Sequence, residues 1–216
     1  MRRKGKLITF EGPDGAGKTT QVNLTAAALR AGGYSVLATR EPGGTRLSEA
    51  VRGLLLDPSF REMTPAAEAL LYAGARAQLV REVLIPALAA GTIVLCDRFV
   101  DSSLAYQGYG RGLDLDLLRT INAFALNGLG PFYTILLDLE PELGLRRSRG
   151  RHAGDRLEHE DISFHHRVRE GYRILARTAP GRIKVVDARG APEEVQARLW
   201  KLVSLYLEDR EPGAPF

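Results

Sequence analysis

A loop near the start of the chain constrains its fold more than any other feature of the sequence. It runs from Gly12 to Thr19 as Gly-Pro-Asp-Gly-Ala-Gly-Lys-Thr, behind the apolar run Leu7–Phe10 and ahead of leucine and alanine at helical spacing. Glycines let successive backbone N–H groups point at phosphate oxygens, while Lys18 can reach the β- and γ-phosphates and Thr19 can offer a hydroxyl to Mg²⁺. A glycine-rich turn that matches by chance is the alternative, and the strand-to-helix context argues against it. The sequence therefore predicts a nucleoside triphosphate site formed by Gly12, Pro13, Asp14, Gly15, Ala16, Gly17, Lys18, Thr19 and Thr20.

Strand and helix patterns alternate along the chain. Five apolar segments predict strands, at Lys6–Glu11, Tyr34–Thr39, Thr92–Asp97, Tyr133–Leu139 and Arg182–Asp187. Helical periodicity predicts helices at Thr19–Ala31, Arg46–Leu56, Pro65–Ala90, Leu115–Leu126, Pro141–Arg149, Ser163–Ala179 and Pro192–Leu207. This alternation is typical of an α/β protein with helices on both faces of a parallel sheet. We expect a three-layer P-loop fold with a five-stranded parallel sheet, in a single domain over residues 1–208 with a tail at 209–216.

Composition limits the possible functions. The formal net charge is +4, but the basic residues are mostly scattered arginines that do not alternate with aromatic residues, which favours anionic small molecules over nucleic acid as partners. No segment of the sequence is long and apolar enough to predict a membrane span. The single cysteine, Cys96, lies in an apolar run and indicates a small buried side chain rather than a nucleophile. We therefore expect a cytoplasmic protein that binds neither membrane nor nucleic acid.

Charged residues follow three of the predicted strands. Glu11–Asp14 follows the first, Thr39–Thr45 the second and Asp97–Phe99 the third. Ligands of an open parallel sheet bind beyond the carboxyl ends of its strands, so these segments should meet at one edge. A carboxylate at the end of an apolar strand suits Asp97 to hold magnesium beside the glycine-rich loop, and a simple cap of the strand end is the alternative. The guanidinium of Arg98 suits a phosphate in the same cavity.

A group of arginines follows the fourth predicted strand: Arg146, Arg147, Arg149, Arg151 and Arg156. Gly150 and Gly154 interrupt the helical pattern there, which favours a mobile lid over about residues 147–160. Arginines that arrive only on closure can neutralise the charge of a transferring phosphoryl group and exclude water. A solvated basic helix end is the alternative for each of these side chains.

Motifs in a fixed order cover nearly the whole chain: the loop Gly12–Thr19, Thr39–Thr45, Glu68–Ala73 with Arg76, Asp97–Phe99, Asp101–Gly108 and Asp155–Glu158. Each is common by itself, but the ordered set is specific, and it resembles the bacterial thymidylate kinase family. The resemblance implies transfer of the γ-phosphate of ATP to thymidine monophosphate, with Mg²⁺ as cofactor, by a homodimer. The nucleophile is a phosphate oxygen whose second pKa is about 6, so no general base is required. Catalysis would then depend on alignment and on charge neutralisation.

The resemblance also implies the groups around the phosphates. Arg40, Arg52 and Arg98 would surround the acceptor phosphate, and Pro42 would follow a cis peptide bond. The metal would lie near Thr19, Asp97 and Glu41, with Glu41 also near the acceptor sugar. Gly15 stands where some members carry an arginine, so a catalytic arginine would come from the lid. The catalytic residues implied are Lys18, Arg98, Arg149 and Arg151, with Arg147 as a further candidate.

For the acceptor nucleoside, the resemblance implies that Tyr72 stacks on the thymine ring and that Arg76 donates to a ring carbonyl. Ser103 and Gln107 would complete the polar edge of the base. Asp14 would bond the 3′-hydroxyl, and Tyr106 would crowd the ribose 2′ position, which favours deoxynucleotides. From the helical pattern alone Tyr72 could be a core aromatic, but Arg76 one helical turn later favours the site.

Three other functions are compatible with parts of the sequence. A different nucleoside monophosphate kinase would share the loop and the lid, but the residues just named for the base argue against it. A GTP-dependent switch would usually carry an Asn-Lys-x-Asp segment, which this sequence lacks. A nucleic-acid-binding protein would bind DNA with a steep salt dependence.

Overall fold

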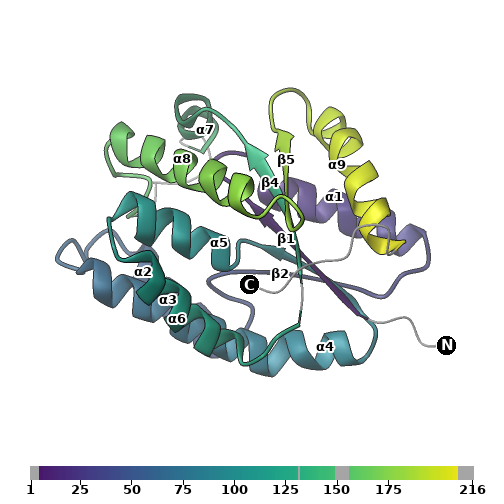
Figure 1. The fold of residues 1–216 in the computed structure, drawn as a ribbon, viewed down its shortest axis with the longest axis horizontal. Coiled ribbons are helices and arrows are strands. Elements are labelled where there is room, and N and C mark those ends of the chain that lie inside the picture. The colour runs from purple at the N-terminus through teal and green to yellow at the C-terminus, as the bar shows by residue number, and fades with distance from the viewer. Residues whose placement is uncertain (1–4, 131, 149–155, 209–216) are drawn as a thin grey trace.

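Five parallel strands form the centre of the computed structural model, which describes residues 5–130, 132–148 and 156–208. They are β1 (Lys6–Glu11), β2 (Val36–Arg40), β3 (Ile93–Asp97), β4 (Tyr133–Asp138) and β5 (Ile183–Asp187). The strands pair in the order β2-β3-β1-β4-β5, which places β1 in the middle of the sheet (Figure 1). All five predicted strands are confirmed, with ends that differ by at most two residues.

Alternate side chains of the central strands bury opposite faces of the sheet. Leu7 of β1 packs with Val94 of β3 on one face, whereas Ile8 and Phe10 pack on the other face with Leu29 of α1. Strands covered on both sides carry near-continuous apolar runs, because neither face is left to water. The apolar runs that predicted these strands therefore also fix them at the centre of the fold.

Helices cover both faces of the sheet. On one face α1 (Lys18–Ala31) packs against α9 (Pro192–Leu207) (Figure 1). The other helices of the described residues are α2 (Arg46–Leu56), α3 (Pro65–Leu79), α4 (Ile85–Ala89), α5 (Val100–Ser103), α6 (Leu115–Leu126), α7 (Pro141–Ser148) and α8 (Ile162–Thr178). Two further segments, η1 (Val80–Leu84) and η2 (Leu104–Gly110), have π-helical geometry. The predicted three-layer α/β arrangement is confirmed.

The helix predicted over Pro65–Ala90 is present but changes its geometry along its length. It begins as predicted at Pro65, and the hydroxyl of the preceding Thr64 accepts a hydrogen bond from the Ala67 N–H at 3.3 Å. It then passes through the π-helical η1 before α4 resumes the α-helix. Pro86 has no N–H to donate to the carbonyl four residues earlier, so regular α-helical bonding fails at this point.

The helical segment formed by α5 and η2 was not predicted. Residues 100–110 contain Gly108 and Gly110, and most of them are buried, so no polar face alternates with an apolar one. Gly110 lies against the ring of Phe164 in α8, where a Cβ would come within 2.7 Å of a ring carbon. Tertiary packing against α8 therefore decides the structure here, where sequence periodicity gives no signal.

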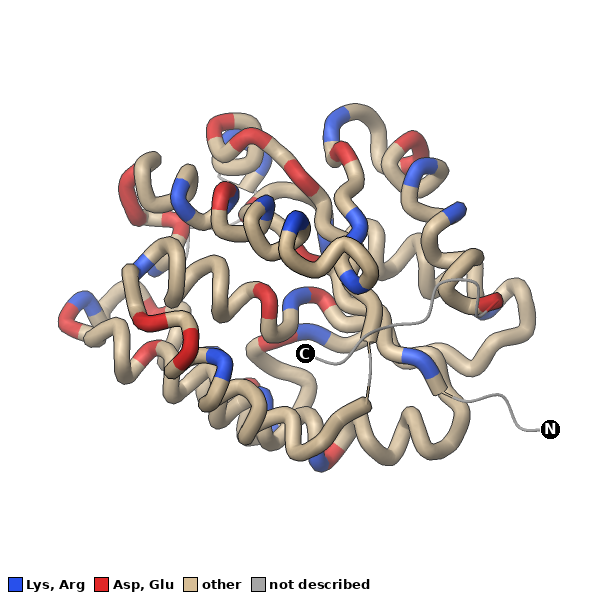
Figure 2. The backbone as a smooth tube through the Cα atoms, viewed as in Figure 1, with Lys and Arg blue, Asp and Glu red and all other residues tan. Residues whose placement is uncertain are grey.

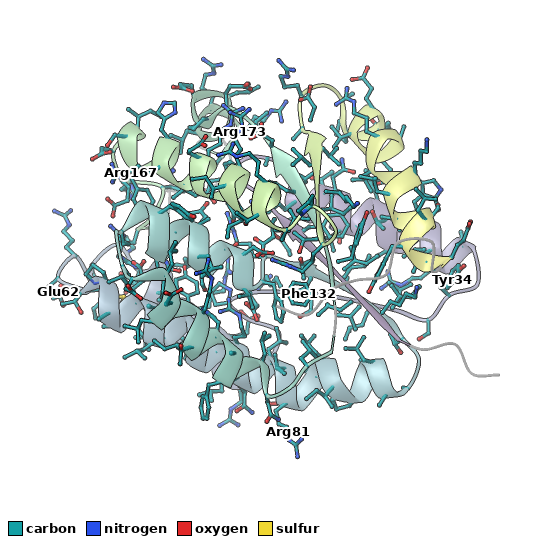
Figure 3. All side chains as sticks on the ribbon, viewed as in Figure 1. Tyr34, Glu62, Arg81, Phe132, Arg167 and Arg173 are labelled. Carbon is teal, nitrogen blue, oxygen red and sulfur yellow. The ribbon has the colours of Figure 1, made fainter. Side chains whose placement is uncertain are left out.

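Charged and apolar side chains occupy different parts of the fold. Positive and negative residues are interspersed along most helices (Figure 2). Phe132 lies in the interior beside the sheet, whereas Arg81 points outward from the helix below it (Figure 3). Cys96 is fully buried, which confirms its predicted packing role. Across the described residues, none of the helices combines the length and apolarity that a membrane crossing requires.

Candidate functional site

The glycine-rich loop between β1 and α1 has an unusual backbone. Gly12, Gly15 and Gly17 adopt φ angles of +138°, +71° and +89°, a region that side chains other than glycine rarely enter. A Cβ on Gly15 would lie 2.0 Å from the carbonyl oxygen of Gly144 in α7. The loop therefore needs glycine both for its curl and for its close approach to α7, and it delivers the chain to the amino end of α1, where backbone N–H groups favour anions.

Lys18 folds back over this loop. Its Nζ donates to the carbonyl oxygens of Gly12 at 3.0 Å and Pro13 at 2.7 Å. The side chain is buried, and burial together with the neighbouring positive charge of Arg98 lowers its pKa to about 8. An ammonium group held by two carbonyl oxygens in this way can exchange those contacts for the oxygens of a triphosphate.

Oxygen ligands suited to magnesium lie at the edge of the same loop. Thr19 Oγ1 donates to Asp97 Oδ2 at 2.5 Å. Glu41 is buried beyond the end of β2, and its Oε1 has no hydrogen-bond partner within the described residues. Burial raises the pKa of Glu41 to about 7, although Arg76 opposes this rise. The donor set fits Mg²⁺, which takes hard oxygen ligands from one or two side chains together with substrate phosphates and water.

No cluster of three or more histidine, cysteine, aspartate or glutamate side chains with metal-binding geometry occurs in the described part of the chain. An ion held by protein groups alone would need such a cluster. Thr19, Asp97 and Glu41 therefore offer oxygen ligands without forming a complete site made of protein groups alone.

Two adjoining depressions open at the carboxyl edge of the sheet. The first, which we call the loop groove, is lined by Asp14, Gly15, Gly17, Lys18, Thr19, Thr20, Arg40, Glu41, Arg52, Asp97, Arg98, Arg147, Ser148 and Glu158. The second, which we call the inner cleft, is lined by Asp14, Glu41, Pro42, Arg52, Leu56, Tyr72, Arg98, Ser102, Ser103, Tyr106, Gln107 and Leu157. Four charged residues, Asp14, Glu41, Arg52 and Arg98, line both and mark where the two meet.

Arg98 lies at that junction in a strained backbone conformation. Its φ is +67°, in the left-handed region, and its N–H donates to the Phe10 carbonyl at 2.9 Å. The guanidinium forms an ion pair with Asp14 and donates to the Tyr106 hydroxyl at 3.1 Å and the Gly12 carbonyl at 3.2 Å. The Asp14 pKa is lowered: burial opposes this shift, but Arg98 and then Lys18 outweigh it. A strained residue held by many contacts is typical of a functional site.

The buried carboxylate of Glu11 holds the groups that surround Arg98. Glu11 accepts from the Phe99 N–H at 2.7 Å, from the Ser102 hydroxyl at 2.5 Å and from the Tyr172 hydroxyl at 3.1 Å. The same two hydroxyls receive hydrogen bonds from Arg98, each at 3.3 Å. Burial, followed by the nearby charge of Asp101, raises the pKa of Glu11 to about 7. These bonds fix the backbone after Arg98 and one side of its guanidinium.

The other two arginines predicted near the acceptor phosphate differ from each other. Arg52 lines both depressions and donates from Nη1 to the Pro42 carbonyl at 3.0 Å. The predicted cis peptide bond between Glu41 and Pro42 is confirmed. Arg40 lines the loop groove but not the inner cleft, and its half-exposed side chain pairs with Glu49 at 3.0 Å. The structure thus brings Arg52 to Arg98 but leaves Arg40 at the outer rim.

Residues predicted to hold a base line the inner cleft but not the loop groove, with one exception. Tyr72, Ser103 and Gln107 all line the inner cleft. Arg76 lies behind the wall, fully buried. Its guanidinium pairs with Glu41 and donates to the Ser103 hydroxyl at 3.0 Å, to the side-chain oxygen of Asn122 and to the Phe99 carbonyl at 3.1 Å. Direct donation from Arg76 to a base stays a prediction.

The predicted lid falls only partly within the described residues. Arg149 and Arg151 lie outside them. Arg147, in α7, donates to the Ala188 carbonyl at 3.2 Å and lines the loop groove. Arg156 differs from the expectation for a lid arginine, because it pairs with the buried Glu68 and donates to the Leu55 carbonyl at 3.1 Å. Since a buried carboxylate and a carbonyl hold it, Arg156 lies away from the loop groove.

Sequence reasoning missed several residues that shape the site. Ser102 was quoted only as part of a motif, and Leu56, Leu157 and Tyr172 were assigned no role. Tyr172 lies in α8, far from Arg98 in the sequence. It contacts Arg98 only because α8 packs on η2. A signal for Ser102 existed, since it neighbours Ser103 and stands one helical turn after Arg98. The sequence carries no comparable signal for Tyr172.

The chain is similar to known proteins over most of its length. The family model described as thymidylate kinase matches residues 10–199. A thymidylate kinase of Deinococcus radiodurans is 55% identical over 201 residues, which cover 93% of this chain and 97% of that protein. One from Synechococcus sp. (strain JA-3-3Ab) is 54% identical over 199 residues, covering 91% of this chain and 94% of that protein.

A solved structure shows the same likeness in three dimensions. The crystal structure of thymidylate kinase from Ehrlichia chaffeensis superposes with a TM-score of 0.77 at 33% sequence identity. The match covers 93% of this chain and 99% of the other. The likeness therefore extends over most of the fold rather than over the glycine-rich loop alone.

Proposed function

The chain belongs to the thymidylate kinase family, and on that premise we propose how its two depressions carry out the reaction. The activity is transfer of the γ-phosphate of ATP to dTMP, which gives ADP and dTDP on the way to dTTP. ATP would bind in the loop groove and dTMP in the inner cleft. The observation that carries this arrangement is that Asp14, Glu41, Arg52 and Arg98 line both depressions. Two anionic substrates can meet there with arginines between them.

Alignment and charge neutralisation would perform the chemistry. The acceptor phosphate has a second pKa of about 6, so at neutral pH its oxygen is already ionised and attacks without a general base. Arg98 and Arg52 would hold that phosphate, with Arg40 approaching from the rim. Lys18 and the loop N–H groups would hold the β- and γ-phosphates. Arg149 and Arg151 remain our candidates for the arginine that contacts the transferring group.

Separate groups would recognise the acceptor sugar and base. Asp14 would accept from the 3′-hydroxyl, and Tyr106, which donates to Asp14 at 2.7 Å, would occupy the space that a 2′-hydroxyl needs. Tyr72 would stack on the ring, while Ser103, Gln107 and, through rearrangement of its present contacts, Arg76 would meet its polar edge. Such hydrogen bonds discriminate strongly, because a wrong base leaves buried polar groups unpaired.

Magnesium is the proposed cofactor. Thr19 and Asp97 would hold it directly or through water, and the orphaned Oε1 of Glu41 would approach it from the acceptor side. When bound, the ion would supply positive charge that neutralises the phosphate oxygens near the transferred group.

A homodimer is also proposed. Large apolar side chains are exposed on α2, α3 and α6, at Leu47, Leu54, Leu70, Leu117 and Phe124. Phe124 is 86% exposed, which is costly for a phenyl ring unless another surface covers it. The helices α2 and α3 pack on each other, as do α3 and α6, so these residues belong to neighbouring elements. Light scattering on the wild type and on a Phe124→Glu variant tests this, and a monomeric wild type would contradict it.

We further propose that residues 1–208 act as one catalytic domain in the cytoplasm, with no nucleic-acid partner. The single cysteine excludes an intrachain disulfide, which suits a reducing compartment. A filter-binding assay with DNA at low salt should detect no specific complex.

A coupled assay of ADP formation tests the proposed function as a whole. The wild-type protein is given ATP, Mg²⁺ and, one at a time, dTMP, dUMP, dCMP, dGMP or AMP. Rapid ADP formation with dTMP, dependence on Mg²⁺ and little turnover of the cytosine and purine nucleotides are expected. ADP formation that does not depend on an acceptor, or that prefers a purine monophosphate, would contradict the proposal.

A further inference from the structure

Glu68 is a buried carboxylate that the proposed mechanism does not use. It lies in the first turn of α3, is completely inaccessible, and receives hydrogen bonds from three side chains. Gln107 Nε2 donates to its Oε1 at 2.8 Å, Arg111 Nη2 donates to its Oε2 at 3.2 Å, and Arg156 pairs with the same Oε2. Burial of a carboxylate is costly unless such partners compensate for the lost water.

Two arginines, Arg111 and Arg156, form ion pairs with Glu68. Arg111 is itself braced by Glu160 at 2.6 Å and lies 4.9 Å from the centre of the Phe164 ring. Arg156 is held by the Leu55 carbonyl. A carboxylate paired with two guanidinium groups has no proton to offer, so it can only accept hydrogen bonds. Any amide that faces it must present nitrogen.

This constraint decides the orientation of Gln107. Its amide nitrogen faces Glu68, so its carbonyl oxygen must lie at the opposite side of the group. Gln107 lines the inner cleft beside Tyr72 and Ser103, and its side-chain oxygen accepts no hydrogen bond from the described residues. The cleft therefore meets Gln107 as an acceptor and not as a donor.

We propose that Glu68 is a positioning residue that fixes the amide of Gln107 and thereby selects acceptor bases that present a ring N–H. The proposal rests on the placement of the base in the inner cleft. Thymine and uracil carry an N–H between their two carbonyl groups, and this hydrogen can reach the Gln107 oxygen. The corresponding nitrogen of cytosine carries a lone pair instead of a hydrogen. This nitrogen and the Gln107 oxygen would then be two acceptors that face each other with no hydrogen between them. A buried mismatch of this kind costs enough to reject a substrate.

Kinetics of Glu68→Gln and Gln107→Ala, alone and together, test the proposal. A glutamine at position 68 can offer either end of its amide, so Gln107 becomes free to rotate. In Glu68→Gln we expect KM for dTMP to rise about tenfold, with kcat and KM for ATP changed less than about twofold. The preference for dTMP over dCMP in kcat/KM should fall at least about tenfold.

The double variant separates positioning from general structural support. If Glu68 acts through Gln107, adding Glu68→Gln to Gln107→Ala should raise KM for dTMP no further. Glu160→Gln is the matched control, because it removes one partner of Arg111 without touching Gln107, and it should leave the dTMP preference unchanged. Glu68→Asp, which keeps the negative charge, should retain more of that preference than Glu68→Gln.

Three outcomes would overturn the proposal, and each contradicts a different step of it. If Gln107→Ala leaves KM for dTMP unchanged, the base lies elsewhere and the placement in the inner cleft fails as well. If Gln107→Ala raises this KM but Glu68→Gln does not, or if their effects add in full, only the role of Glu68 fails. Should the variants unfold, competition for dTMP binding to the wild-type protein decides instead. If dCMP displaces dTMP at the same concentration as dUMP, the cleft does not select for a ring N–H and the proposal is refuted.

Discussion

The loop groove and the inner cleft recognise their ligands by different means. In the loop groove the main elements are backbone: three glycines at positive φ, the amino end of α1, and Lys18 resting on carbonyl oxygens of its own loop. In the inner cleft they are side chains from separate parts of the chain, such as Asp14, Arg98 and Tyr106. Each of these side chains is held by one or more others.

This difference follows from what each depression must distinguish. Phosphate oxygens are alike in every nucleotide, so a curled backbone suffices to hold them. A base and a sugar differ between nucleotides only in a few donors, acceptors and hydroxyl groups, so the cleft needs fixed side-chain orientations. Two buried hydrogen-bond networks hold these orientations, one around Glu11 and Arg98 and the other around Glu68.

Arg98→Ala should separate the two depressions most sharply. The change removes the guanidinium at their junction, so we expect kcat to fall about a thousandfold. The affinity for a nonhydrolysable ATP analogue should stay within about threefold of wild type, because the loop backbone is untouched. Steady-state kinetics and calorimetric titration measure the two effects.

Arg98→Lys provides the control for charge. Lysine keeps the positive charge but lacks the planar fork that contacts Asp14, Tyr106 and Gly12 at once, so most of the kcat loss should remain. Near-normal turnover in Arg98→Ala would contradict the assignment, and a parallel loss of ATP affinity would show that the two depressions do not act separately.

Gly15→Ala should show that the stability and the ATP affinity of the loop depend on its backbone conformation and on its close contact with α7. The new methyl group would lie 2.0 Å from the Gly144 carbonyl at a φ of +71°, so we expect a loss of about 3 kcal/mol in the free energy of unfolding. ATP affinity should fall with it. Urea denaturation and nucleotide titration measure both.

Gly17→Ala is the matched control. Gly17 also has a positive φ, of +89°, but no atom lies within 4 Å of the position that its Cβ would take. It should cost only the backbone strain, about 1 kcal/mol. Equal losses in the two variants would mean that the contact between the loop and α7 is unimportant.

The same contrast explains what the sequence could predict. The loop is contiguous, and each residue in it has a local reason, so its function could be read without knowledge of the fold. The strands could be predicted because burial on both faces leaves long apolar runs. Contacts such as Tyr172 to Arg98 join residues far apart in the sequence, and no local pattern encodes them.

Side-chain orientation was the least predictable property of the site. The sequence pointed to Arg40 and Arg76 as direct ligands, but it could not show that Glu49 holds Arg40 at the rim or that Asn122 and Glu41 hold Arg76 behind the cleft wall. It also grouped Arg156 with the lid arginines. Glu68, which holds that arginine, is 88 residues away in the sequence, so periodicity gave no hint of the pair.

Tyr72→Ala tests the cleft without touching the junction. Stacking of a base on an aromatic ring is worth about 2 kcal/mol, so KM for dTMP should rise about thirtyfold while KM for ATP stays unchanged. Tyr72→Phe keeps the ring and should change KM for dTMP less than about threefold. An equal rise of both KM values in Tyr72→Ala would show that Tyr72 supports the core rather than the ligand.

The smallest expected effect concerns Lys18, because ATP binding requires the positive charge of this side chain. Burial and Arg98 lower its pKa to about 8 in the ligand-free protein, whereas the negative triphosphate must raise that pKa again on binding. ATP binding therefore takes up a proton above pH 8, and its affinity should be about tenfold weaker at pH 9 than at pH 7. Lys18→Arg keeps its charge over this range and should bind ATP with no such loss. dTMP contacts the cleft, so its affinity should change little between these pH values, and a parallel decline for both nucleotides would place the titrating group at the shared junction instead of in the loop.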